Sequence, residues 1–336
     1  MKKSFSIHTD PLNTDFDQAN ILYKKYKENN KQDRHEEILE LKKVCNILDS
    51  LNIKNWLDFG TLLGMFRDQN LIPHDNDIDI SIVLDSDEVM YKLVEKLSDH
   101  YYIKHYEVGY ISIYPKNNPN FGYQHIDIYR YKENINKKLI KYICWPECKL
   151  RNYFINELLT LKYKDIIFNI PNHTEDYIKM FYGPDYKTIS KEFHGTDPDK
   201  NKDYNFNEQV KVYITGVFDL FHIGHVNILK KCKKYFDNVI VGIHNDNIVQ
   251  TYKPKPIIPY NQRLEVLRSC KYVDQIIENA DINVDNSFLD TIGAKFLVYG
   301  REKTKATDFY KVTKDRIHIF ERTEQISTTI IKNNII

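Results

Sequence analysis

The stretch that most constrains the fold begins with a run of β-branched and aromatic residues at 210–215, followed at once by Gly216. The run is typical of a buried parallel strand, and residues 226–235 repeat apolar side chains at the spacing of a helix. The break at Gly216 is therefore a strand-to-helix turn, the place where ligands bind in open α/β sheets. Further strands are expected at 239–243, 296–299 and 317–320, so residues 210–336 predict a doubly wound, Rossmann-like parallel sheet.

Two histidines, His222 and His225, stand where this helix begins. They are three residues apart, so both side chains can face the same side, and Gly224 between them lets a ligand approach the backbone. Free backbone amides and the helix dipole favour an anion here, and the same field disfavours a charged imidazolium. We therefore expect two neutral imidazoles that donate hydrogen bonds to phosphoryl oxygens. A dinucleotide-binding turn would instead need a GxGxxG pattern, which is absent.

These residues resemble the HxGH motif of the cytidylyltransferases that make CDP-alcohols from CTP and an alcohol phosphate. Residues 322–329, RTEQISTT, are similar to that family's second signature, RTEGISTT. The resemblance covers about residues 210–336 and implies CTP as substrate, Mg²⁺ (or Mn²⁺) bridging the triphosphate, and a homodimer formed through this domain. The catalytic residues that it implies are His222, His225, Lys253 and Arg322. The CTP contacts that it implies are Gly216, Phe218, Asp219, Gly224, Lys255, Arg263, Ser327, Thr328 and Thr329.

The family's catalytic lysine matches Lys253 or Lys255, and we favour Lys253. In the choline enzymes of the family a carboxylate precedes the glycine of the turn, and a pair of acids follows the glycine of a later strand. Here these places hold Thr215 and Arg301-Glu302, so Thr215 and Arg301 are expected to face the alcohol phosphate. A quaternary ammonium needs carboxylates or an aromatic cage, so Thr215 favours an uncharged polyol such as glycerol. Residues 244–253 and 267–277 look more like the choline and ethanolamine branch, which leaves phosphocholine and phosphoethanolamine open.

The first half of the chain carries a second candidate site. In residues 78–84 isoleucines alternate with polar residues, so a strand here places Asp77 and Asp79 on one face, and Asp127 in HIDIY has the same arrangement. Adjacent carboxylates repel each other unless a cation lies between them. These three aspartates, opposite a predicted turn at Gly60-Thr61, suit one or two divalent ions that clamp a phosphoryl group. The alternative is that they only solvate the outer face of a strand.

This part of the chain resembles the LicD and fukutin-related phosphotransferases, whose fold is that of the nucleotidyltransferases. Their LDFGTLLG is found at 57–64, and their IPWDDDIDI at 72–80, with His74 and Asn76 in place of a tryptophan and an aspartate. The resemblance spans about residues 35–190. It implies an α+β nucleotidyltransferase-like domain with Gly60 and Thr61 at the donor and metal ions on Asp77, Asp79 and Asp127.

Together the two resemblances imply a bifunctional enzyme. The C-terminal domain would make a CDP-alcohol, and the N-terminal domain would transfer the alcohol phosphate from it to a glycan of a capsule, lipopolysaccharide, teichoic-acid-like polymer or glycoprotein. In one alternative the N-terminal domain is a non-catalytic module for glycan binding or assembly. In another it is a nucleotidyltransferase that acts on a hydroxyl of a small molecule or a protein.

Length and charge bound these interpretations. A chain of 336 residues is expected to form two domains, here 35–190 and 210–336, with an N-terminal extension at 1–34 and a linker at 191–209. The net charge of +1 gives no electrostatic case for binding nucleic acid. No run approaches the roughly 20 apolar residues of a membrane span, so we expect a cytoplasmic protein, with a peripheral position at the inner face of the membrane, where glycans are assembled, as the alternative.

Overall fold

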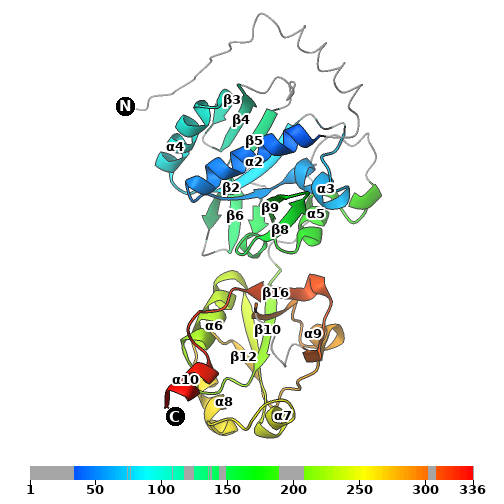
Figure 1. Cartoon of the computed structure of the whole chain (residues 1–336). Helices are drawn as coiled ribbons and strands as arrows, with labels where there is room; N and C mark the ends of the chain where they lie inside the picture. Colours follow the sequence, from blue (N-terminus) through cyan, green and yellow to red (C-terminus); the bar gives the residue numbers. More distant parts are fainter. Residues whose placement is uncertain are drawn as a thin grey trace, which may run out of the picture. The chain divides into compact units, whose positions relative to one another are not determined.

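The computed structural model describes residues 34–73, 75, 77–107, 109–116, 125–134, 136, 138–143, 149–188, 208–301 and 308–335. The chain forms two compact units, Met1–Phe206 and Asn207–Ile336, each with its own sheet (Figure 1). Most of the expected extension and linker lies outside the described residues, as do His74, Asn76 and Glu302.

The first unit is built on a seven-stranded mixed sheet. Its main path runs β1 (Lys54–Leu57), β2 (Asp77–Val83), β5 (His125–Asn134), β4 (Tyr110–Pro115) and β3 (Tyr101–Glu107), and β6 (Leu139–Tyr142) and β7 (Lys149–Arg151) extend it beside β5. The pair β2–β5 is parallel, and the other pairs are antiparallel. A second, two-stranded sheet pairs β8 (Leu159–Tyr163) with β9 (Ile166–Ile170).

Helices cover this sheet and bury its apolar side chains. They are α2 (His35–Ser50), α3 (Phe59–Arg67), α4 (Asp87–Ser98) and α5 (Thr174–Tyr182), with short 3-10 turns at 152–154 and 186–188. The apolar side chains of α2 form one buried stripe, which packs against β1 and α4. Strand β2 is buried on both faces, since Ile80 is fully buried and Asp79 is only 5% exposed. Asp79 therefore does not solvate an exposed face, which was the alternative interpretation of the pattern.

The predicted turn at Gly60-Thr61 is wrong. Helix α3 begins at Phe59, so both residues lie in its first turn, and the Asp58 carboxylate accepts a hydrogen bond from the Phe59 amide at 2.8 Å. Phe59 has a φ of 41°, so the sharp change of direction falls one residue earlier than the glycine suggested.

The second unit is the doubly wound parallel sheet that the sequence predicts. Its strands lie in the order β12 (Gln275–Ile277), β11 (Asn238–Ile243), β10 (Lys211–Gly216), β14 (Phe296–Gly300) and β16 (Ile317–Phe320), and all pairs are parallel. Four of these strands were predicted, and the edge strand β12 was missed because it has three residues. The short strands β13 (Val284–Asp285) and β15 (Tyr310–Lys311) form a separate pair.

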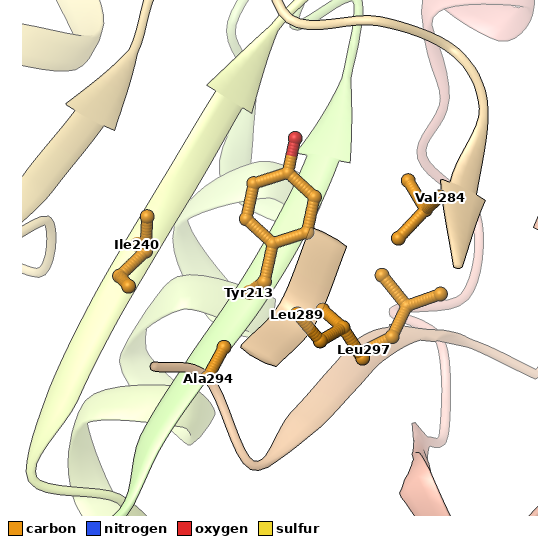
Figure 2. Close-up of a cluster of buried hydrophobic side chains, with 6 residues drawn as sticks. All are labelled: Tyr213, Ile240, Val284, Leu289, Ala294 and Leu297. Carbon is orange, nitrogen blue, oxygen red and sulfur yellow. The ribbon is translucent and has the colours of Figure 1, made fainter. Parts of the chain in front are cut away.

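Helices lie on both sides of this sheet, with α6 (Ile223–Tyr235) and α9 (Asn286–Thr291) on opposite sides of β10 (Figure 1). The remaining helices are α7 (Asp246–Gln250), α8 (Tyr260–Arg268) and α10 (Thr328–Ile335). On the α9 side the core contains Tyr213, Ile240 and Leu297 from three neighbouring strands, packed against Leu289 (Figure 2). The chain reverses its direction of winding between β10 and β14, and ligands bind at the carboxyl ends of strands at such a point.

In the parts of the chain that the structure describes, the helices are all too short or too polar to cross a bilayer.

Candidate active sites

A cavity of about 310 Å³ opens at the carboxyl ends of β10 and β14, where α6 and α10 begin. This is the position that the strand order predicts for a ligand. Most of the residues predicted for CTP and its chemistry line the cavity: Thr215, Gly216, Phe218, Asp219, His222, Gly224, His225, Lys253, Arg322, Ser327, Thr328 and Thr329. Lys255, Arg263 and Arg301 do not line it.

The two histidines are held at the start of α6 by a reciprocal capping arrangement. The Gly224 amide donates to Nδ1 of His222 at 3.1 Å, and the His222 amide donates to Nδ1 of His225 at 3.3 Å. The two rings stack with their centroids 4.0 Å apart. Because each Nδ1 accepts a hydrogen bond, each neutral ring carries its proton on Nε2. Both rings therefore have an N–H donor left for a ligand in the cavity.

Both imidazoles are neutral at pH 7, as expected from the sequence. Burial lowers the pKa of His225 to about 3, with further lowering by His222 and Arg322. Burial also lowers the pKa of His222, and Arg322 adds to the effect. The sequence argument gave the helix field as the cause, whereas burial is the largest contribution in the structure.

Gly224 makes the close packing of these rings possible. A Cβ atom at this position would lie 2.9 Å from Cε1 of His222, so any side chain would displace the ring. Phe218 and Leu220 in the preceding loop have φ values of 55° and 46°, which non-glycine residues rarely adopt. The Phe218 ring lies 5.3 Å from that of His225, so this loop conformation brings an aromatic wall to the histidine pair.

The RTEQISTT segment forms the opposite wall. Ser327 caps α10 by accepting a hydrogen bond from the Ile330 amide at 3.1 Å, and Thr328 donates its hydroxyl proton to the Asp219 carbonyl at 3.0 Å. Ser327 is therefore the residue that caps the start of α10. The cavity thus lies between the N-termini of two helices, both of which favour an anion.

Three predicted ligand contacts have a different place in the structure. Arg263 is 1% exposed and donates to the carbonyls of Val217, His244 and Ile258, so it holds the loops around the cavity together. Arg301 pairs with Glu321 at the surface. Lys253 and Lys255 are both exposed side chains, but only Lys253 is among the described residues that line the cavity, where desolvation together with Arg322 lowers its pKa.

Asp219 lines the cavity, but its carboxylate is occupied by the protein. It accepts hydrogen bonds from the amides of Ile257 and Ile258 at 3.0 and 2.9 Å and pairs with Lys332 at 3.3 Å. A carboxylate would also repel a triphosphate. Asp219 therefore anchors the loop before α8, and its contact with CTP stays a prediction.

The first unit gathers a second group of titratable residues on β2 and β5. The register of these parallel strands places Asp79 opposite Asp127 and Asp77 opposite His125. Carboxylate oxygens of Asp75, Asp77 and Asp79 lie within 4.8 Å of one another, and so do ligand atoms of Asp77, His125 and Asp127. The structure thus brings together the three predicted aspartates and adds Asp75 and His125.

Gly60 and Thr61 hold Asp79 in place. The Gly60 amide donates to Asp79 Oδ2 at 3.1 Å, and the Thr61 hydroxyl accepts a hydrogen bond from the Asp79 amide at 2.8 Å. A Cβ atom on Gly60 would lie 2.3 Å from an Asp75 oxygen, so glycine is needed for Asp75 to approach. These contacts make both residues supports of the carboxylate cluster, and the donor contact expected for them stays a prediction.

Burial and mutual repulsion raise the pKa values of two carboxylates in this cluster. Burial raises the pKa of Asp77 to about 7, and neighbouring Asp75 adds to the effect. Burial also raises the pKa of Asp79 well above its usual value, and the charges of Asp77 and Asp75 add to it. Asp127 is 3% exposed, and within the described part of the chain its Oδ1 atom has no hydrogen-bond partner. Such a set of oxygens with one unsatisfied acceptor fits a hard divalent cation such as Mg²⁺ or Mn²⁺.

Two supporting residues escaped the sequence analysis. The Tyr129 hydroxyl donates to Asp79 Oδ1 at 3.1 Å, and fully buried Asp58 accepts from Tyr177 at 2.8 Å and from Ser81 at 2.6 Å. Tyr129 follows Asp127 by two residues on β5, so the alternation that identified Asp127 also predicts its side. The bond from Tyr177 to Asp58 spans 119 residues and has no local signal.

Comparison with known proteins matches each unit of the chain to a different family. Residues 213–334 match the family described as "Cytidylyltransferase-like", and residues 52–173 match "LicD/FKTN/FKRP, nucleotidyltransferase domain". The chain therefore joins a LicD-type domain to a cytidylyltransferase-like domain. Each match includes the residues that form the site in its unit.

Similar curated proteins match part of this chain. An ethanolamine-phosphate cytidylyltransferase of Dictyostelium discoideum is 31% identical over 125 residues, which is 36% of this chain and 35% of the relative. Choline-phosphate cytidylyltransferase 2 of Arabidopsis thaliana is 35% identical over 136 residues, 38% of this chain and 45% of the relative. The matched part is thus less than half of either relative. Among solved structures, a lipopolysaccharide core biosynthesis protein from Thermoplasma volcanium is 23% identical, with a TM-score of 0.30 and coverage of 35% of this chain and all of that one.

Proposed function

We propose that the cytidylyltransferase-like domain converts CTP and a small alcohol phosphate into a CDP-alcohol and pyrophosphate. The observation that carries this proposal is the pair of neutral histidines whose Nε2–H groups are left for a ligand. They share one cavity with Lys253 and Arg322, between two helix N-termini. This arrangement suits a ligand with several phosphoryl groups.

The reaction needs no covalent intermediate and no general base. An oxygen of the alcohol phosphate attacks the α-phosphorus of CTP, the bond from that phosphorus to the bridging oxygen breaks, and pyrophosphate leaves. The attacking phosphate oxygen carries no proton, so His222 and His225 act as hydrogen-bond donors. Their Nδ1 atoms are already occupied by backbone amides, which agrees with this role.

Catalysis then consists of positioning and charge stabilisation. The Nε2–H groups of the histidines stabilise the equatorial oxygens as negative charge builds. Lys253 and Arg322 stabilise the leaving pyrophosphate as cations. Mg²⁺ or Mn²⁺ bound to the triphosphate would enter with the substrate.

The first unit supports a second activity, transfer of the alcohol phosphate from the CDP-alcohol to a glycan hydroxyl. The acceptor oxygen would bond to the phosphorus that bears the alcohol, the phosphoanhydride bond would break, CMP would leave, and a carboxylate of the cluster would take the hydroxyl proton. Asp77, Asp79 and Asp127 would hold Mg²⁺ or Mn²⁺, which when bound supplies positive charge to the phosphoryl oxygens. The raised pKa values of Asp77 and Asp79 and the unsatisfied Asp127 oxygen among the described residues support this proposal.

The names of the relatives point to phosphocholine or phosphoethanolamine as the alcohol phosphate, whereas Thr215 favours glycerol 3-phosphate. For the glycan we propose a cell-surface or glycoprotein acceptor modified on the cytoplasmic side, and for the assembly a homodimer through the second unit.

The first activity is tested by incubating the protein with CTP or ATP and each of these three alcohol phosphates while pyrophosphate release is followed. Release with CTP and an alcohol phosphate is expected. Pyrophosphate release with ATP but not with CTP would refute the cytidylyltransferase proposal.

The second activity is tested with preformed CDP-alcohol labelled either in the alcohol or in the nucleoside. The label in the alcohol should reach a glycan acceptor. Transfer of the nucleoside label would show a nucleotidyltransferase, and transfer of neither would leave the first unit as a binding module.

A further inference from the structure

A chain of hydrogen bonds forms one wall of the second unit's cavity. Thr215 and Tyr252 line the cavity, and fully buried His244 lies between their hydroxyl groups. Oγ1 of Thr215 lies 2.9 Å from Nε2 of His244, and the Tyr252 hydroxyl lies 2.7 Å from Nδ1 of the same ring. Neither His244 nor Tyr252 was among the residues predicted from sequence.

The proton positions along this series of hydrogen bonds follow from its last acceptor, the Gly242 carbonyl. Thr215 donates its hydroxyl proton to the Gly242 carbonyl at 3.1 Å, so its oxygen accepts from His244 Nε2–H. His244 is neutral because burial lowers its pKa to about 4, helped by Lys253 and Arg263. A neutral ring with its proton on Nε2 must accept at Nδ1, so the Tyr252 hydroxyl donates inward. The reverse arrangement would lose the bond to Gly242. The wall therefore presents acceptor lone pairs of Tyr252 and Thr215 to a ligand.

A third hydroxyl lies behind the same wall. Tyr213 is fully buried, and its hydroxyl has no hydrogen-bond partner of normal geometry among the described residues. It points toward the carboxyl ends of the strands, where the cavity opens (Figure 2). A Cβ atom on Gly242 would lie 1.9 Å from this hydroxyl and 2.9 Å from Thr215 Oγ1, so both groups border the same glycine. Gly242 thus makes room for a group of hydroxyls at this end of the sheet.

The charges at this wall disfavour a cationic ligand. Lys253 Nζ lies 5.6 Å from the centroid of the Tyr252 ring, so a cationic side chain already lies over that ring, where a ligand cation would bind. The acids among the described lining residues are Asp219 and Glu321, and both are paired, with Lys332 and Arg301 respectively. The Tyr299 and Tyr310 rings have centroids only 5.9 Å apart, which leaves no space for a trimethylammonium group between them.

From these observations we propose that Thr215, His244 and Tyr252 select the alcohol, and that they select an uncharged polyol phosphate through its free hydroxyls. A polyol hydroxyl donates to the lone pairs of Tyr252 or Thr215. A trimethylammonium group has no proton to donate and would meet Lys253 without a carboxylate to compensate its charge. A primary ammonium can donate a hydrogen bond but meets the same positive charge, so phosphoethanolamine should be preferred less than a polyol phosphate and more than phosphocholine. This inference rests on the proposed cytidylyltransferase activity and on Thr215 facing the alcohol phosphate.

The test compares glycerol 3-phosphate, phosphoethanolamine and phosphocholine as partners of CTP, with pyrophosphate release as the measurement. The wild-type chain should prefer glycerol 3-phosphate to phosphocholine by at least about tenfold in kcat/KM, because a site built to hydrogen-bond a hydroxyl rejects ligands that lack one. Preference for phosphocholine or phosphoethanolamine would overturn the inference and leave the proposed function intact. Failure of all three with CTP would remove the proposed function itself, and the inference with it.

Two variants test the wall directly, and a third is their control. Tyr252→Phe keeps the ring and removes the hydroxyl, so kcat/KM for glycerol 3-phosphate should fall about tenfold while KM for CTP is unchanged. Thr215→Asp places a carboxylate beside the alcohol and should raise kcat/KM for phosphoethanolamine and phosphocholine relative to glycerol 3-phosphate. Tyr235→Phe, at the end of α6 and outside the cavity lining, is the matched control and should change neither ratio.

One further outcome would show that the wall contacts CTP and not the alcohol phosphate. If Tyr252→Phe raises KM for CTP and leaves the ratio among the three alcohol phosphates unchanged, the wall contacts the nucleoside and the inference is wrong. A thermal melt of each variant against wild type separates loss of selectivity from loss of folding, and Thr215→Asp remains informative if Tyr252→Phe fails to fold because its effect is a gain with two substrates.

Discussion

The two sites have opposite electrostatics. In the second unit, burial lowers the pKa values of His222 and His225, so two bases become neutral donors surrounded by cationic side chains. In the first unit, burial raises the pKa values of Asp77 and Asp79, so acids crowd together beside an unsatisfied Asp127 oxygen. The same physical cause, desolvation of the charged form, therefore prepares one site for an anion and the other for a cation.

This difference shows that the side chains of the second unit can bind their ligand without a further component, whereas those of the first unit need a bound cation. The histidine site already contains the donors that a phosphate needs, in the correct tautomer. The carboxylate site has acceptors in excess, and a bound cation would satisfy them. Removing one acid and removing one donor should thus have different effects on stability as well as on activity.

The largest effect is expected for Asp77→Asn. Transfer from preformed CDP-alcohol should fall at least about 10³-fold, since a metal ion supplies several kcal/mol of charge stabilisation in such a site. Without divalent ions the variant should melt at a higher temperature than wild type, because it relieves repulsion among buried carboxylates. Calorimetric titration with Mn²⁺ checks the weakened ion binding.

The matched control for this prediction is Asp99→Asn, an exposed aspartate at the end of α4. It should leave Mn²⁺ affinity, melting temperature and transfer unchanged. Full transfer activity in Asp77→Asn would show that the carboxylate cluster does not serve the second step.

The next effect is a loss of about 10²- to 10³-fold in kcat for CDP-alcohol formation in His222→Asn, the range for removal of one oxyanion donor. Asparagine is a good N-cap, so the start of α6 should persist while the Nε2–H donor is lost. Pyrophosphate release measures the rate, and circular dichroism checks the fold. Unchanged kcat in a folded variant would remove His222 from the catalytic group.

A smaller effect distinguishes the two candidate lysines. Lys253→Met should lower kcat/KM for CTP by roughly tenfold to a hundredfold, because it removes a point charge from the cavity. Lys255→Met should stay within about twofold, since Lys255 is exposed and does not line the cavity. The opposite order would transfer the catalytic role to Lys255.

The sequence predicted the elements that depend on local pattern. Alternation identified β2 and the facing aspartates, and the HxGH turn placed the start of a helix at its two histidines, where α6 begins. Residues that act through distant partners were not predictable in this way. Arg263 looks like a ligand contact at the start of a helix, but its partners lie on three different loops.

Proton positions were also beyond the sequence. That His222 and His225 carry their protons on Nε2 follows from backbone amides that reach each Nδ1, and that His244 accepts from Tyr252 follows from a threonine on the neighbouring strand. The spacing of the histidines showed that they could face one ligand. It did not show which atom of each ring would face it.

The smallest effect expected is in the pH profile. The pKa values of His225 and His244 are lowered to about 3 and 4 in the folded protein, below the usual 6.5, so the unfolded chain binds protons on these rings that the folded chain does not. Between about pH 4 and 6.5 each ring should make the second unit more stable as pH rises, by at most about 1.4 kcal/mol per pH unit, and above that window the effect should vanish. The groups near His225 agree with this direction, because His222, Arg322 and Lys253 all lower its pKa and Asp219 raises it.

The neutral state of His225 also predicts a flat activity profile. With saturating substrates, kcat should change less than about twofold between pH 6.5 and 8, and the Cε1 proton of His225 should keep its NMR shift over that range. A fall in kcat near pH 6.5 together with a titrating Cε1 signal would show instead that His225 keeps an ordinary pKa and becomes charged in this range, which contradicts its role as a neutral donor.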